Sequence, residues 1–260
     1  MSQINDYFIQ AELAMAAYAN LNVGAPSQGE LIQAGMSSVQ AAQFASKWVV
    51  VEQYNDPITG VSATVFEEVG TGKKHLAVRG TQDPADFVAD YLILTGVPSE
   101  LNPQYLSLKS KLNEWLGDGT LNQGFTVAGH SLGGYLSAGL IADFSTSISH
   151  AYLYNAPGNN SLISQVMVDM GIASAPDASK ITTLQADAGI SPIAGLGNDF
   201  SPLNEVFIED QLDPNLISTA PASLNHSQQV LTDSLAVYSL FATLGTTGKR
   251  GQSTILSNIG

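Results

Sequence analysis

The amino-acid sequence predicts an α/β fold, in which a mostly parallel sheet is flanked by helices on both faces. Short apolar strands alternate with helical segments over residues 106–244, a spacing typical of parallel strands joined by crossover helices. The chain has 260 residues, of which 44% are hydrophobic, and this is enough for one substantial core. No internal repeat is present, so we expect a single domain over residues 1–260 with a loosely held polar tail at 246–260.

Hydrophobic periodicity and turn residues locate the individual elements. The predicted helices cover residues 10–20, 37–48, 106–116, 132–144, 161–170 and 228–244. The predicted strands cover residues 48–53, 61–68, 75–79, 125–128, 151–155 and 181–185. Ser37 or Ser38 is expected to cap the second helix, and residues 70–73 are expected to form a hairpin-type turn.

The charge balance narrows the classes of partner. The chain carries 23 acidic and 9 basic side chains, a formal net charge of −14, which repels phosphate backbones and anionic membrane surfaces. We therefore expect a neutral small-molecule or lipid substrate and no nucleic acid. No apolar stretch is long enough for a transmembrane segment, and the absence of Cys excludes disulfides and thiolate metal sites.

The N-terminus bears on localisation. Residues 1–6 lack the basic start and apolar run of a cleaved signal peptide. The sequence therefore predicts either a protein secreted without a cleaved signal peptide or one that stays in the cytoplasm.

Residues 125–134 combine an apolar strand, a Gly-x-Ser-x-Gly turn and the start of a helix of small residues. A serine at such a strand-to-helix turn is held in strained backbone geometry with its hydroxyl clear of the sheet. Gly129 and Gly133 leave room for the backbone to double back. The helix N-terminus beneath Ser131 can stabilise an oxyanion, so Ser131 is predicted to be a nucleophile.

A serine nucleophile needs a general base, which in turn needs a carboxylate to orient it. The chain has four histidines. His75 opens an earlier strand, His130 should point away from Ser131, and no acid-bearing strand end separates His150 from Ser131. His226, in a loop before the last helix, is the predicted base; a helix-capping or surface role is the alternative.

The acid is expected at the carboxyl end of the strand at 181–185, where Asp187 follows directly. An Asx-turn is the alternative role for Asp187, and Asp199 is its main rival as the acid. Weaker candidates are Glu205, Glu209, Asp210 and Asp213. Residues 195–200 resemble one turn of a calcium-binding β-roll, but a single copy cannot form the stacked site. No cofactor is therefore expected, and calcium binding is left open.

A second oxyanion donor is expected after the strand at 75–79. Thr81 can offer its backbone N–H and its hydroxyl there, together with the N–H of Leu132.

These residues carry a family resemblance. Arg79-Gly80-Thr81 with Phe87 and Asp90 behind it, followed by Gly-His-Ser-Leu-Gly-Gly, resembles the class 3 lipases, as does the Ala-Met-Ala-Ala-Tyr segment near the N-terminus. The strand at 61–66 is similar to the catalytic domains of bacterial lipases exported by type I systems. The resemblance spans residues 10–245 and implies an α/β-hydrolase fold. Two departures are a missing C-terminal repeat array and Phe87 in place of the usual Trp.

The resemblance also implies roles for individual residues. Carried over position by position, Ser131 is the nucleophile, Asp187 the acid and His226 the base. Thr81 and Leu132 then form the oxyanion hole.

Two apolar segments, at 87–97 and 190–221, predict a lid-like insertion over the site, with a plain extension of the core as the alternative. The expected activity is hydrolysis of carboxylic esters with a lipid-like acyl group, possible at a lipid–water interface. The alternatives are a phospholipase A1, a polyester or polyurethane hydrolase, and a non-catalytic binding module of an exported protein.

Overall fold

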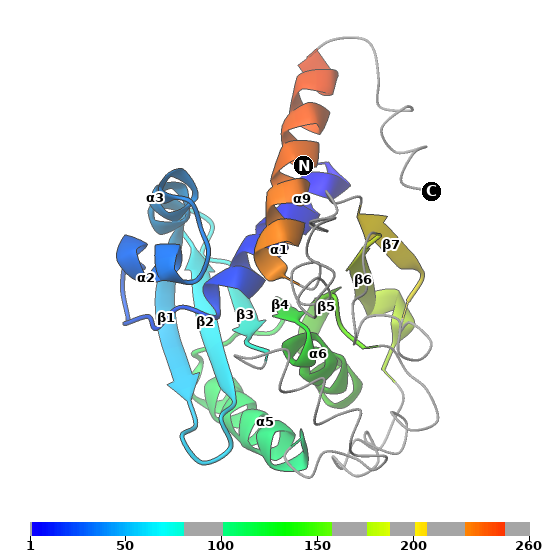
Figure 1. The fold of residues 1–260 in the computed structure, drawn as a ribbon. Coiled ribbons are helices and arrows are strands. Elements are labelled where there is room, and N and C mark those ends of the chain that lie inside the picture. The colour runs from blue at the N-terminus through cyan, green and yellow to red at the C-terminus, as the bar shows by residue number, and fades with distance from the viewer. Residues whose placement is uncertain (1, 81–100, 158–175, 188–200, 207–226, 248–260) are drawn as a thin grey trace, which may run out of the picture.

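The computed structural model describes residues 2–80, 101–157, 176–187, 201–206 and 227–247 (Figure 1). Its strands are β1 (Trp48–Asn55), β2 (Ser62–Glu68), β3 (Lys74–Val78), β4 (Phe125–His130), β5 (Ile148–Tyr154), β6 (Ile181–Ala186) and β7 (Leu203–Val206). Its helices are α1 (Gln3–Ala16), α2 (Gln28–Gln33), α3 (Ser38–Lys47), α5 (Leu101–Asp118), α6 (Leu132–Asp143) and α9 (Gln228–Thr247), with a 3₁₀ turn at Ala178–Lys180. None of the helices in these ranges is long and apolar enough to cross a bilayer.

The strands form one seven-stranded sheet in the order β1 to β7. β1, β2 and β3 pair antiparallel, and every pair from β3 to β7 is parallel, so the predicted mostly parallel sheet is confirmed. The carboxyl ends of β3, β4, β5 and β6 therefore meet at one edge of the sheet, the edge where α/β proteins carry their sites.

Helices cover both faces of the sheet. α1 and α9 lie against each other on one face, and α5 and α6 cover the other (Figure 1). Alternate residues of β3 enter different clusters: Leu76 and Val78 pack on the α5–α6 side, and Ala77 packs on the side of α1 and α3. The predicted covering of both faces is confirmed.

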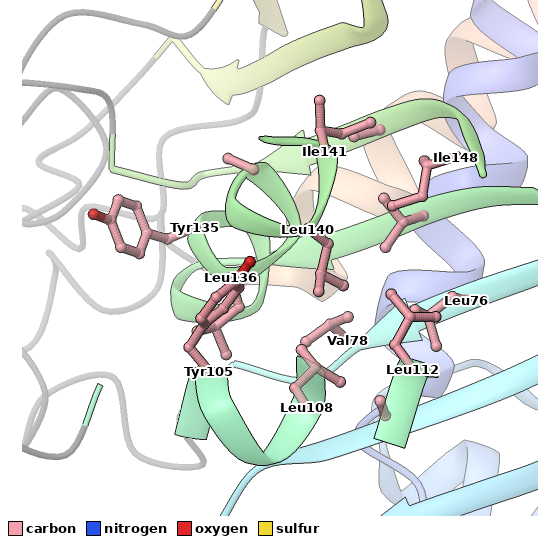
Figure 2. Close-up of a cluster of buried hydrophobic side chains, with 14 of the residues drawn as sticks. Leu76, Val78, Tyr105, Leu108, Leu112, Tyr135, Leu136, Leu140, Ile141 and Ile148 are labelled. Atoms are coloured by element: carbon pink, nitrogen blue, oxygen red, sulfur yellow. The ribbon is translucent and has the colours of Figure 1, made fainter. Parts of the chain in front are cut away.

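The core between α5, α6 and the sheet is the largest of the three clusters of buried hydrophobic side chains in the described ranges. Figure 2 shows its side chains converging from both helices and from β3 and β5: Leu76, Val78, Tyr105, Leu108, Leu112, Tyr135, Leu136, Leu140, Ile141 and Ile148. Tyr105 of α5 donates a hydrogen bond to the carbonyl of Gly139 (2.9 Å) and lies 2.8 Å from the carboxylate of Asp143. Residues 132–141 of α6 are buried on every side, which explains why this helix has no polar face.

Most predicted elements are confirmed, with boundaries shifted by a few residues. The capping box of Ser37 and Gln40 starts α3, and the hairpin joins β2 to β3. The first helix, expected at 10–20, instead begins at Gln3 and ends at Ala16, so Tyr18 lies beyond its end. The helix expected at 161–170 and the tail at 248–260 lie outside the described residues.

The expected cover at 190–221 needs a correction. Residues 203–206 form β7, which pairs with β6, and Val206 is buried in the cluster beneath α9. Leu203 and Val206 therefore belong to the sheet. Four residues with one buried side chain are too few for a recognisable strand pattern, which is why β7 was missed. The rest of 190–221, apart from residues 201–202, and all of 87–97 lie outside the described residues.

Two ionisable side chains are buried between α1 and the sheet. Glu12 is 7% exposed, and burial raises the pKa of its carboxyl to about 7, opposed by the charge of Lys47. His75 is 8% exposed, and burial lowers the pKa of its imidazole to about 4, opposed by the charge of Glu68. Both groups are therefore neutral in the folded protein between about pH 4 and pH 7.

We expect these two shifts to cancel in the pH dependence of stability. Between the ordinary pKa values of 4.5 and 6.5, folding adds a proton to Glu12 and removes one from His75. In His75→Gln, the free energy of unfolding should fall as pH rises from 4.5 to 7, because only the protonated carboxyl of Glu12 is tolerated. In Glu12→Gln it should fall as pH drops from 6.5 to 4, because only the neutral imidazole is tolerated. In each variant, the free energy of unfolding should change by about 3 kcal/mol over the stated pH range.

Urea unfolding from pH 4 to pH 8 measures both variants against the unchanged chain. Profiles of the same slope in the two variants would contradict this account.

Candidate active site

Ser131 lies between the end of β4 and the start of α6, at φ 56° and ψ −126°, with 1% of its surface exposed. Such a conformation costs a non-glycine residue about 1–3 kcal/mol and persists only where the surroundings hold it. The N–H of Ser131 donates to the carbonyl of Tyr154 (2.9 Å), and its carbonyl accepts from the N–H groups of Gly134 (3.0 Å) and Tyr135 (3.2 Å). The predicted strand, sharp turn and helix around Ser131 are confirmed.

Two glycines allow backbone to touch backbone at this turn. A Cβ on Gly129 would lie 2.3 Å from the carbonyl oxygen of Gly133. A Cβ on Gly133 would lie 2.2 Å from the carbonyl oxygen of Val78. No side chain fits in either place, so the glycines bring the first turn of α6 into contact with both β4 and the end of β3.

The N-terminus of α6 supplies one predicted oxyanion donor. Leu132 is the first residue of α6, where a backbone N–H has no carbonyl one turn earlier in the helix to bond and lies at the positive end of the dipole. Gly80 approaches from the end of β3: a Cβ there would lie 2.6 Å from the carbonyl oxygen of His130 and 3.3 Å from Cβ of Ser131. Thr81, the other predicted donor, follows Gly80 but lies outside the described residues.

Asp187 directly follows β6 and is exposed. Its N–H donates to the carbonyl of Val206 (3.0 Å), and the N–H of the preceding Ala186 donates to Oδ1 of Asn155 (3.0 Å). Asn155 is fully buried at φ 44° and follows β5, whose last residue accepts the N–H of Ser131. These contacts place Asp187 on the same edge of the sheet as Ser131.

Asn155 is a residue that the sequence analysis did not identify. A lone Asn after an apolar strand carries no distinctive signal, and only the paired strand ends reveal its contact with β6. Asp199 and His226 lie outside the described residues, although the described chain resumes at Ser227, just before α9.

Of the other three histidines, two lie toward the amino ends of their strands and the third, His130, directly precedes Ser131. Nδ1 of His75 lies 2.6 Å from Oγ1 of Thr126, and Nε2 of His150 lies 2.8 Å from Oγ1 of Thr182, both toward the amino ends of their strands. His130 contacts Tyr18 beyond α1, with 2.9 Å between Nδ1 and Oη. These positions agree with the elimination that led to His226, whose role as the base remains a prediction.

Within the described ranges, no three His, Asp or Glu side chains gather closely enough to hold a metal ion. The segment at 195–200, which resembles a calcium-binding turn, lies outside those ranges.

No protein-family model and no curated protein matches the sequence. Solved structures match its fold. The Lip2 lipase of Yarrowia lipolytica has a TM-score of 0.51 and 20% identity, with 82% of this chain and 81% of that chain covered. Lipase II of Rhizopus niveus has a TM-score of 0.52 and 15% identity, covering 90% of this chain and 97% of that one. A triacylglycerol lipase whose catalytic centre is described as a serine protease triad has a TM-score of 0.55 and 15% identity, with coverage of 90% and 97%.

At these identities the likeness concerns the fold. The similarity to bacterial lipases exported by type I systems remains a prediction, because the lipases of Yarrowia and Rhizopus do not test it. These matches and the mostly parallel seven-stranded sheet, covered by helices on both faces, together show that the chain has an α/β-hydrolase fold.

Proposed function

We propose that the chain is a serine hydrolase of carboxylic esters with a neutral, lipid-like acyl group. The observation that carries this proposal is the strained, enclosed Ser131 at the N-terminus of α6, with the end of β3 in backbone contact beside it. The matched lipases share this fold, and one of them is described with a serine protease triad, which supports the same chemistry here.

In the proposed reaction, Oγ of Ser131 attacks the ester carbonyl while His226 takes its proton, and Asp187 orients His226. The N–H of Leu132, the dipole of α6 and Thr81 stabilise the tetrahedral oxyanion. The C–O bond to the alcohol then breaks, and His226 protonates the departing oxygen. Water, deprotonated by His226, attacks the acyl-enzyme, which releases the carboxylic acid and returns the proton to Ser131.

Charge supports a neutral substrate. The net charge of −14 disfavours anionic esters in general. Arg79, beside the site at the end of β3, donates from Nη2 to the carbonyl of Gly60 (3.0 Å), and burial lowers the pKa of its guanidinium. At least one guanidinium nitrogen is thus directed at the loop between β1 and β2. We therefore place neutral esters ahead of phospholipids as substrates.

Removing the nucleophile tests the chemistry. Ser131→Ala should lower kcat on p-nitrophenyl esters by at least about 10³-fold, because no other group can form the acyl-enzyme. Circular dichroism and the unfolding midpoint should show that the fold is retained. Ser149→Ala is a matched control that should keep kcat. Ser149 lies at the amino end of β5, the edge of the sheet opposite Ser131, and its hydroxyl donates to the carbonyl of Phe125 in β4.

The same assay, run from acetate to palmitate, separates the alternatives. Turnover that survives in Ser131→Ala would refute the nucleophile. Activity confined to short chains would indicate an esterase rather than a lipase. An unchanged chain that neither hydrolyses esters nor reacts with a serine-directed phosphonate would be a binding module.

The acid is tested by two matched amide substitutions. Asp187→Asn should lower kcat by about 10³-fold, because an amide cannot stabilise the imidazolium of His226. Asp199→Asn should leave kcat within about twofold. The reverse pattern would move the acid to Asp199, and equal losses would leave neither aspartate as the sole acid.

Metal independence is the remaining expectation. Hydrolysis should be unchanged by a calcium chelator, because the proposed steps use protein groups alone. Loss of activity that added Ca²⁺ restores would assign a calcium site, and residues 195–200 would be examined first.

A further inference from the structure

The hydroxyl of Tyr18 joins two segments that flank the proposed site. Oη lies 2.9 Å from Nδ1 of His130, and it also accepts a hydrogen bond from the N–H of Gly80. Since the oxygen accepts from Gly80 through a lone pair, its single proton stays free to be donated to Nδ1. We call this pair of hydrogen bonds the Tyr18 bridge.

The bridge connects the residues directly before the two groups that would act on the substrate. Gly80 precedes Thr81, the predicted donor from β3, and His130 precedes Ser131. The contact is close: a Cβ on Gly80 would lie 2.7 Å from Oη of Tyr18 and 2.6 Å from the carbonyl oxygen of His130. The hydroxyl therefore occupies space that is open only because residue 80 is glycine.

Tyr18 is itself held from outside the site. Gln53 of β1 donates from Nε2 to the carbonyl of Ala19 (2.9 Å) and accepts the N–H of Leu21 at Oε1 (2.9 Å). The same amide nitrogen donates to Oγ1 of Thr64 in β2 (2.9 Å). The turn after α1 is thus attached to the antiparallel strands, which gives the bridge an anchor independent of β4 and α6.

The hydroxyl is also chemically suited to this task. Burial raises the pKa of Tyr18 above its ordinary value, against the opposing effects of the Gly80 hydrogen bond and Arg79. The phenol consequently keeps its proton, and with it the capacity to donate to His130, at the pH values used to measure ester hydrolysis.

We propose that Tyr18 is a positioning residue, whose hydroxyl keeps the end of β3 and the turn at Ser131 at the separation that the transition state requires. This inference rests on the proposed ester hydrolysis. The oxyanion forms between Leu132 and Thr81, so a small displacement of one donor weakens stabilisation of the transition state more than binding of the substrate. Loss of the bridge should therefore lower kcat and leave KM nearly unchanged.

Tyr18→Phe removes the hydroxyl and keeps the ring. We expect kcat to fall by about 10- to 100-fold, with KM within about threefold. Affinity for a long-chain alkyl boronic acid, which forms a tetrahedral adduct with Ser131, should fall by a similar factor. Affinity for the corresponding fatty acid should stay the same.

Tyr105→Phe is the matched control. Tyr105 is also enclosed, and its hydroxyl contacts Gly139 and Asp143 between α5 and α6. This variant should lose a comparable amount of thermal stability and keep kcat. Hydrogen exchange of the Gly80 amide should become faster in Tyr18→Phe and stay unchanged in Tyr105→Phe.

The outcomes separate this inference from the proposed function. A Tyr18→Phe variant with the kcat of the unchanged chain would overturn the positioning role, as would equal losses of kcat in both variants. Unaltered exchange at Gly80 would also overturn it. An unchanged chain without turnover, or full activity in Ser131→Ala, would instead refute ester hydrolysis at Ser131, and the positioning role with it.

Discussion

The site depends on a direct contact between the backbone at the end of β3 and the first turn of α6. At Gly133 the carbonyl of Val78 occupies the place of a Cβ, and at Gly129 the carbonyl of Gly133 does so. With no side chain between these backbone segments, van der Waals contact limits how closely they approach, and the proposed role of Tyr18 is to hold them at that separation. A donor pair for an oxyanion needs this kind of preorganisation, because donors that must move at the moment of reaction stabilise it less.

The strain at Ser131 persists because its surroundings are tightly packed. Relaxing its φ of 56° would move either β4, in the middle of the sheet, or α6, whose first ten residues are all buried. Tyr105 contacts the carboxyl half of α6, at Gly139 and Asp143, away from this turn. The central strand β4 and the buried first turn of α6 thus hold the nucleophile in its unfavourable conformation.

The sequence predicts the parts of this molecule whose signal is local. Apolar periodicity locates the long helices and central strands, and the Gly-x-Ser-x-Gly turn identifies Ser131 because its steric demands are met by adjacent residues. β7 was missed because it is short and partly exposed, and its identity as a strand comes from pairing with β6. Asn155 and Tyr18 were missed as site residues because their partners are distant in sequence: Tyr18 and His130 are 112 residues apart.

Helix α1 shows how parts without predicted catalytic residues take part in the site. Its first eight residues contact β3 and β5, where Asp6 accepts from Tyr152 and Gln10 lies near His75 at the amino end of β3. Its carboxyl end delivers Tyr18 to the opposite edge, at Gly80 and His130. The segment from α1 to Tyr18 therefore reaches both edges of the sheet, and Gln53 of β1 holds the turn that follows the helix. The antiparallel strands thus help to position the site, because they hold the turn from which Tyr18 reaches His130, the residue before the proposed nucleophile.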